Sequence, residues 1–127
     1  MRALQIVLKK KWFDMIADGI KHEEYREIKP FWMKRLYYML VCDADGGYDR
    51  VTMTEGEARN IIEHLEEDLR NGNIEPRPFD GVMFYLGYAK DRPKMYVPIE
   101  RITIGTGNPE WGAEPGKKYF VIKLKRS

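Results

Sequence analysis

Residues 81–88, GVMFYLGY, are the stretch that decides the fold of this chain. Apolar and aromatic side chains occupy both its odd and its even positions, which is typical of a central strand covered on both faces. Further strands are predicted at 4–8, 95–104 and 119–125. Pro98 cannot donate a ladder hydrogen bond, so the strand at 95–104 is expected at a sheet edge or with a bulge.

A short helix is predicted directly after the first strand. Trp12, Phe13 and Ile16 recur there at helical spacing. Gly19 tolerates the left-handed conformation that ends a helix, so it is expected to turn the chain into a strand at 20–28.

Two later helices are predicted from their first residues. Pro30 ends the strand before it and opens a helical turn over 31–36. Thr54 and Glu57 have the spacing of a capping box, in which each side chain satisfies a free backbone N–H of the other. A helix is therefore expected at 55–71, just before a glycine.

The order of these elements predicts the fold class. Four or five strands are interrupted by helices without regular βαβ alternation, which favours an α+β fold with a mixed, barrel-like sheet. The length of 127 residues suits one domain, 1–127, with one hydrophobic core.

Composition excludes several classes of protein. Hydrophobic residues make up 43% and charged residues 33%, a balance that fits neither a disordered chain nor a membrane protein. No apolar run approaches the roughly 18 residues of a spanning helix, and the one at 3–8 is too short for a signal peptide. Cys42 is the only cysteine, so no intrachain disulfide and a cytoplasmic location are expected, with Cys42 as a small buried hydrophobe.

Charge is distributed unevenly along the chain. The net charge of +2 divides into +4 over residues 1–36, −7 over 37–80 and +5 over 81–127. If the two basic segments fold together, they present a positive face that suits a phosphate-bearing partner. The alternative is that these cations are ordinary solvated side chains.

The stretch 19–26, GIKHEEYR, combines residue types that can do chemistry. Glu24 and Arg26 share a strand parity and are expected on one face, while Lys21 in the preceding turn is freer to converge on them. Such a cluster can clamp a phosphate, accept from a base edge, or act as a general base beside cations. A strand ion pair between Glu24 and Arg26 is the alternative. No metal or cofactor is expected, because the chain has no glycine-rich phosphate loop and no Cys/His ligand spacing.

The pattern GxKxxExR at 19–26 resembles the signature of the ASCH domain family, a branch of the PUA-like β-barrels. The strand and the Trp-Phe helix before it follow the order that this family shows. So do the strands at 84–88 and 119–124 after it. The resemblance implies a small PUA-like mixed β-barrel with flanking helices.

The resemblance covers residues 1–36 and 79–127, so residues 37–78, with the helix at 55–71, look like an insertion. It implies a cleft, lined by the motif, that binds RNA or a nucleotide. Some members resemble RNA-cleaving enzymes, and a bacterial subgroup resembles amidohydrolases that remove an acetyl group from a modified cytidine. In that subgroup a threonine proposed as nucleophile stands where this chain has Glu24, which offers no hydroxyl for direct attack.

Further ligand-binding residues are predicted beside the motif. Lys29 and Arg92 are expected as flanking cations. Tyr88, Lys90 and Arg92 fall in a basic hairpin turn suited to base stacking and charge neutralisation, and an ordinary polar turn is the alternative. Trp111 either stacks on a base or plugs the end of the barrel.

Three functions follow from these residues. The first is recognition of RNA or a nucleotide in a basic cleft built from Lys21, Glu24 and Arg26. The second is a hydrolase, either an amidohydrolase on a modified nucleoside or a ribonuclease, with Glu24 as general base and Lys21 as electrostatic stabiliser. The third is a protein-interaction module that uses the helix of the insertion. The sequence leaves the oligomeric state open.

Overall fold

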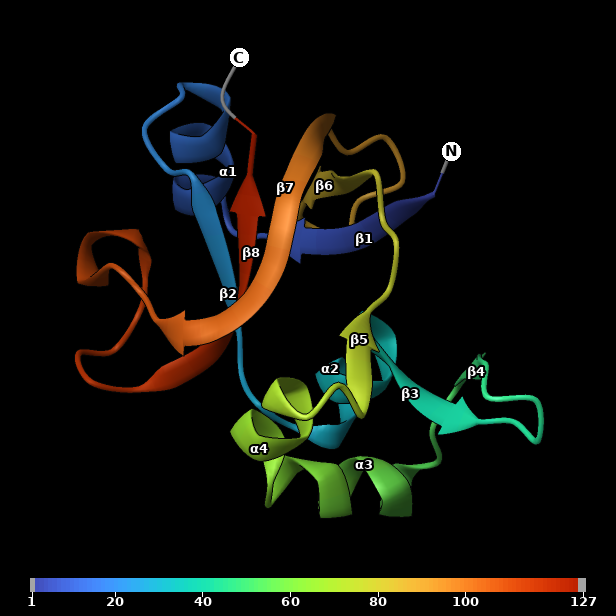
Figure 1. Cartoon of the computed structure of the whole chain (residues 1–127). Coiled ribbons are helices and arrows are strands. Elements are labelled where there is room, and N and C mark those ends of the chain that lie inside the picture. Colours follow the sequence, from blue (N-terminus) through green and yellow to red (C-terminus); the bar gives the residue numbers. More distant parts are fainter. Residues whose placement is uncertain (1, 126–127) are drawn as a thin grey trace. The chain divides into compact units, whose positions relative to one another are not determined.

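The computed structural model describes residues 2–125, which divide into two compact units (Figure 1). Of the described residues, the first unit contains 2–25 and 78–125, and the second contains 26–77. Both units mix helices and strands, so the expected α+β class is confirmed at this level. The finer PUA-like assignment and the single domain 1–127 stay predictions. None of the described helices is long and apolar enough to cross a membrane.

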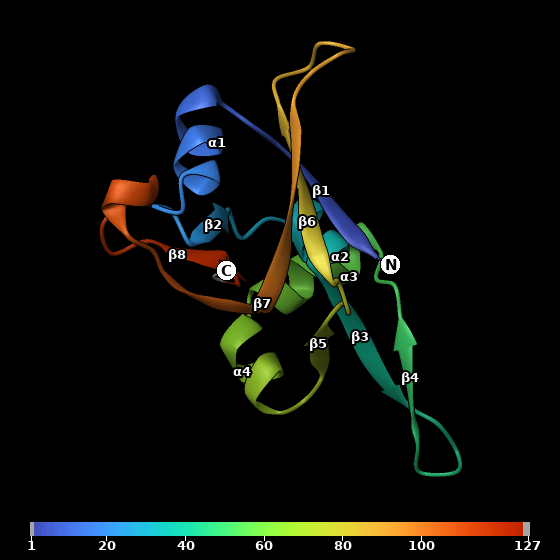
Figure 2. The ribbon, with the colours of Figure 1, turned by 90° about the horizontal axis from the view of Figure 1, so that it is seen from above.

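The first unit is built on a five-stranded sheet with the order β1-β6-β7-β8-β2. β1 and β6 are parallel, whereas β6, β7 and β8 pair antiparallel. The long strand β7 bends along its length, and the sheet curls with it into a half barrel (Figures 1 and 2). The strands are β1 (Ala3–Leu8), β2 (Glu23–Arg26), β6 (Gly81–Leu86), β7 (Lys94–Thr106) and β8 (Lys118–Leu124).

The central position predicted for residues 81–88 is confirmed. β6 lies between β1 and β7, with Val82 and Phe84 fully buried. Pro98 lies in β7, which is not an edge strand, so the edge alternative is wrong and the bulge alternative holds. The register between β7 and β8 shifts between Ile99 and Arg101, directly after Pro98, which has no backbone N–H.

The helix α1 (Lys10–Ala17) follows β1 as predicted and buries Phe13 and Ile16. Gly19 ends it with a φ of +74°. The strand predicted at 20–28 is shorter, because the N–H groups of Ile20 and Lys21 both donate to the Met15 carbonyl at the end of α1. These two residues therefore belong to the turn, and β2 begins at Glu23.

The second unit holds a three-stranded antiparallel sheet with the order β4-β3-β5. None of its strands was predicted, because β3 follows a helix without a turn residue between them and β4 exposes three of its four residues. The elements of this unit are α2 (Pro30–Leu36), β3 (Tyr37–Cys42), β4 (Tyr48–Val51), α3 (Glu55–Ile62), α4 (Leu65–Arg70) and β5 (Ile74–Pro76).

The capping box at Thr54 is confirmed, but the single helix at 55–71 is wrong. The N–H of Glu57 donates to the Thr54 hydroxyl and the N–H of Thr54 donates to the Glu57 carboxylate. The helix breaks near His64, whose N–H donates to the carbonyl of Ile61, three residues back. This tighter last turn ends α3, and α4 restarts with Leu65 buried.

The prediction that Cys42 is buried is also wrong, because its thiol lies on an exposed part of β3. The strand β5 pairs only with Tyr37–Met39. The last part of β3 therefore pairs with β4 alone, and both Val41 and Cys42 are open to solvent.

Candidate functional site

The buried charges of the described residues are Lys21 and Glu24, both in the first unit. Their residues are 2% and 4% exposed. The Lys21 ammonium lies 3.2 Å from Oε2 of Glu24, and the other carboxylate oxygen of Glu24 accepts from the N–H of Tyr25 at 3.1 Å. The turn after Gly19 thus directs the lysine into the interior, where it meets the carboxylate three residues later.

Aromatic rings and a backbone carbonyl complete the surroundings of the Lys21 ammonium. It donates to the carbonyl of Trp111 at 2.7 Å. It also lies 4.4 Å from the ring centroid of Trp12 and 5.7 Å from that of Tyr25. Ring faces attract cations, and more strongly where water is excluded. Lys21 therefore ties α1, β2 and the loop before β8 together.

Tyr25 connects this pair to the same loop. Its hydroxyl donates to Glu23 at 2.8 Å and accepts from the N–H of Asn108 at 2.9 Å. Burial raises the pKa of this hydroxyl above its ordinary value of 10.0. The ring packs with Ala113, Tyr119 and Val121 in a small core cluster.

A hollow of about 530 Å³ lies beside Lys21 in the first unit. We call it hollow A. Its wall is formed by the end of α1 with the turn that follows, the start of β7 and the end of β8. The polar and aromatic members of this wall include Lys21, His22, Tyr96 and Lys125, among apolar neighbours such as Met95.

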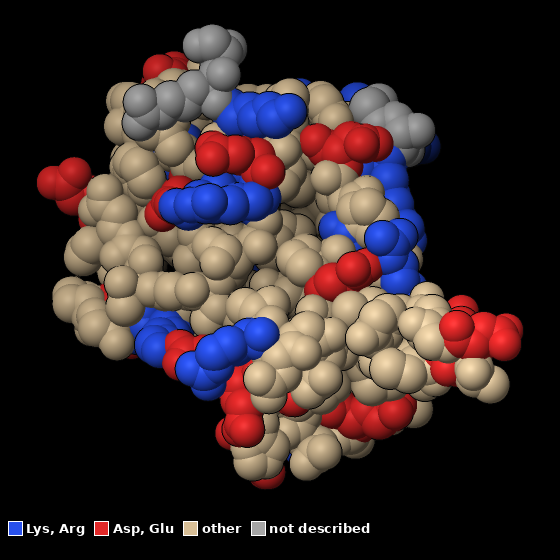
Figure 3. Space-filling model, in the orientation of Figure 1, with Lys and Arg blue, Asp and Glu red and all other residues tan. Residues whose placement is uncertain are grey.

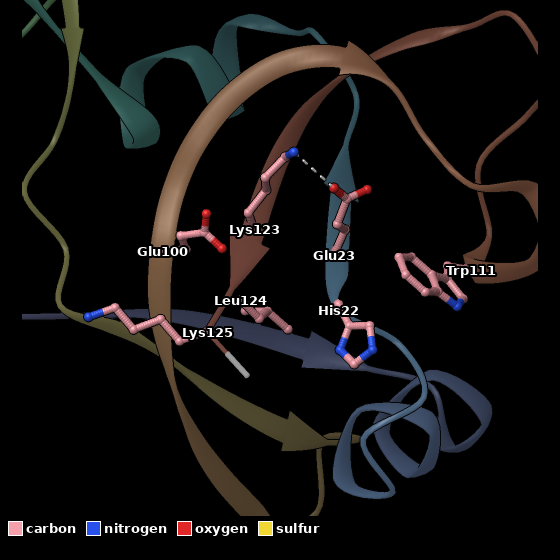
Figure 4. Close-up of a pocket in the computed structure, with 7 residues that line it drawn as sticks. All are labelled: His22, Glu23, Glu100, Trp111, Lys123, Leu124 and Lys125. Atoms are coloured by element: carbon pink, nitrogen blue, oxygen red, sulfur yellow. Dashed lines mark ion pairs between the residues drawn. The ribbon is translucent and has the colours of Figure 1, made fainter. Parts of the chain in front are cut away.

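A second hollow, hollow B, has a volume of about 500 Å³ and lies along β2, β7 and β8 (Figure 4). His22 and Trp111 lie side by side at one end, with ring centroids 5.4 Å apart in an edge-to-face arrangement. Its lining residues are His22, Glu23, Glu100, Trp111, Lys123, Leu124 and Lys125. The ammonium of Lys123 lies 3.5 Å from the carboxylate of Glu23.

Of the predicted cluster, Lys21 and Glu24 form an ion pair. Arg26, the last residue of β2, is grouped with the second unit, and its guanidinium lies 5.2 Å from the ring centroid of Trp32. Lys29, the predicted flanking cation, also belongs to the second unit and pairs with Glu27 at 2.9 Å. The interior pair is therefore Lys21 with Glu24.

The basic hairpin between β6 and β7 forms as predicted. The ring of Tyr88 projects from it and is 84% exposed. The guanidinium of Arg92 lies 4.1 Å from the ring centroid of Tyr85 and donates to the carbonyl of Gly87. Lys90 is exposed in the same turn. Hollows A and B contain none of these turn residues among the described lining.

Trp111 packs as a plug would, while its stacking on a base stays a prediction. Its ring packs against the core cluster around Tyr25, as a plug does, and it also lines hollow B. Sequence reasoning missed Tyr96, Lys123 and Lys125 as lining residues. The shared parity of Lys123 and Lys125 at the end of the last strand is a signal that could have indicated them.

Charges on the surface are mixed in sign. On the face in Figure 3, Lys and Arg side chains lie beside Asp and Glu side chains. By sequence, the first unit carries fourteen Lys and Arg against nine Asp and Glu, a net charge of +5. The second carries eight against eleven, a net charge of −3. The basic surplus of the chain thus belongs to the unit with the two hollows. Over residues 2–125, no group of three or more His, Cys, Asp or Glu is placed to hold a metal ion.

No model of a protein family matches the chain, and neither a curated protein nor a solved structure matches it.

Proposed function

We propose that the first unit binds single-stranded RNA or a nucleotide, with the ligand in hollow A. The observation that carries this proposal is the buried Lys21–Glu24 pair, whose lysine forms part of the wall. Desolvating two charges costs several kcal/mol per ion. A contribution to stability is therefore a weak explanation for a buried ion pair. Buried ionisable groups beside a cleft are frequent at functional sites.

The size and lining of hollow A support the same ligand class. Its volume of about 530 Å³ falls within the roughly 300–1,000 Å³ of small-molecule sites. The ring of His22 offers a surface on which a base can stack, and Lys125 offers a cation for a phosphate. The ammonium of Lys125 has no ion pair among the described residues. The net charge of +5 on this unit favours an anionic partner.

The resemblance of residues 19–26 to the ASCH signature is consistent with this proposal. In the structure, Lys21 of that pattern lines hollow A and pairs with Glu24, and the guanidinium of Arg26 lies over the Trp32 ring. We infer that Lys21 and Glu24 position the wall of the site, and that His22 and Lys125 contact the ligand. A cytoplasmic PUA-like RNA-binding domain is the assignment that we propose on these residues.

The test is the affinity for a labelled single-stranded RNA, measured by fluorescence anisotropy at several salt concentrations. Affinity is expected to fall with salt as counterions are released. His22→Ala should cost about 1 kcal/mol or more of binding if a base stacks on the ring. Lys125→Met should weaken binding more than Lys9→Met, a matched control that removes the same charge from an exposed site outside both hollows. No binding at low salt would refute the proposal.

The hydrolase is the alternative proposal, and it differs in what Glu24 does. Glu24 lies 3.2 Å from the Lys21 ammonium, but it is not among the described residues that line either hollow. A general base must reach the proton that it takes, directly or through one water. Incubation with an acetylated cytidine and with RNA tests this alternative, since Glu24→Gln should then abolish turnover and leave binding intact.

A further inference from the structure

Hollow A and hollow B adjoin each other. His22, Leu124 and Lys125 line both of them. Each has a volume of about 500 Å³, so each alone lies within the range of small-ligand sites. A ligand long enough to occupy both hollows would pass these shared residues.

The ring of Trp111 in hollow B is held in place by its own loop. The short 3₁₀ turn η1 (Pro109–Trp111) begins at Asn108, whose side chain accepts from the N–H of Glu110 at 2.9 Å. The N–H of Asn108 donates to the buried Tyr25 hydroxyl. The carbonyl of Trp111 accepts from Lys21 at 2.7 Å.

The half-buried Trp111 ring has one part packed against the core cluster and another part lining hollow B. Its position is thus set without a ligand, and a preorganised aromatic surface saves the entropy of ordering a side chain on binding. Any base has a π-face, so stacking on such a surface tolerates every sequence. Lys123 and Lys125 also line hollow B, and such cations suit the phosphate that links two nucleotides.

We propose that the ligand is a single-stranded segment of at least two linked nucleotides, with one base in hollow A and its neighbour stacked on Trp111 in hollow B. This inference rests on the proposed function and narrows it, because a free nucleoside or mononucleotide fills only one hollow. The linking phosphate passes His22 and Lys125, which both hollows share. Two concave sites require bases splayed out of a stack, so single strands bind in preference to duplexes.

The experiment compares ligands of increasing length on the full chain by titration calorimetry. The probes are uridine 5′-monophosphate, the dinucleotide UpU and a uridine tetranucleotide, with an adenine series beside them. The dinucleotide should bind about tenfold more tightly than the mononucleotide, the gain of one stacked base. The indole N–H signal of Trp111 in an NMR spectrum should shift with the dinucleotide and not with the mononucleotide.

Variants of Trp111 separate stacking from folding. Trp111→Ala should remove the gain from the second nucleotide and leave mononucleotide affinity unchanged, while Trp111→Phe should retain most of the gain. The bond to Lys21 uses the backbone carbonyl of Trp111, so both variants preserve it. Equal affinities for mononucleotide and dinucleotide, with an unmoved Trp111 signal, would overturn this inference and leave the proposed function standing. Failure of every nucleotide and oligonucleotide to bind would overturn the proposed function as well.

Discussion

The two units of this chain differ in what they bury. The second unit fills its interior with apolar and aromatic side chains such as Met33, Leu36 and Tyr37. The first unit does the same in its sheet, but it also buries Lys21 and Glu24. The net charges differ in the same sense, +5 against −3. A desolvated ion pair whose lysine lines hollow A is not explained by apolar packing, and this is why the candidate site is assigned to the first unit.

The largest effect is expected at the buried pair. Lys21→Met leaves the Glu24 carboxylate buried without its cation, which should cost about 3–5 kcal/mol of unfolding free energy. Chemical denaturation followed by circular dichroism measures this loss.

The matched control is the double variant Lys21→Met with Glu24→Leu. It replaces both charges by apolar groups of similar length, so it should recover most of the stability that the single variant loses. A single variant as stable as the original protein would show that the pair is hydrated, and the contrast between the two interiors would then disappear.

The second prediction tests whether the second unit takes part in binding RNA. Leu36→Ala removes a fully buried side chain and should lower stability by about 2–5 kcal/mol. Measured below its melting temperature, the variant should bind single-stranded RNA as tightly as the original protein. A weakened affinity in the folded variant would place part of the site in the second unit.

The smallest effect appears only at alkaline pH. Burial raises the pKa of both Tyr25 in the first unit and Tyr37 in the second above the ordinary 10.0. The unfolded chain therefore releases these protons first. The stability that both hydroxyls contribute is complete below pH 10 and falls as the pH rises above it.

Melting temperatures from pH 8 to pH 11 measure this fall. Tyr25→Phe and Tyr37→Phe should each reduce its steepness, and at pH 7 Tyr25→Phe also loses the two hydrogen bonds of its hydroxyl. If neither variant changes the slope, the two hydroxyls titrate normally and are more open to solvent than the structure shows.

Much of the first unit could be predicted from local sequence. Apolar residues at both parities of 81–88 predicted the central strand β6, because only a strand covered on both faces needs them. In the second unit, the capping box at Thr54 was equally predictable, since its two hydrogen bonds join residues three apart. The bulge beside Pro98 followed from the missing N–H of proline.

The errors have tertiary causes. The strand β3 has an apolar sequence that predicts burial of Cys42, but β5 is too short to cover its end. Apolar residues recur at helical spacing through 55–71, at Ala58, Ile61, Ile62, Leu65 and Leu69, so they do not reveal the break near His64, after which the chain restarts and buries Leu65.

Some features of the candidate site were also predictable from the sequence, and others depend on the tertiary structure. By itself the sequence determined that Lys21 and Glu24 could meet, because a turn residue and a strand residue three positions apart are close in any such fold. Only the tertiary structure decided that Arg26 lies over Trp32, and that the carbonyl accepting from Lys21 comes from Trp111, ninety residues away. It also decided that the end of β8 lies beside His22, where the two hollows meet. Periodicity and spacing report on neighbours along the chain, whereas contacts across such distances depend on how the sheet curls and where its loops return.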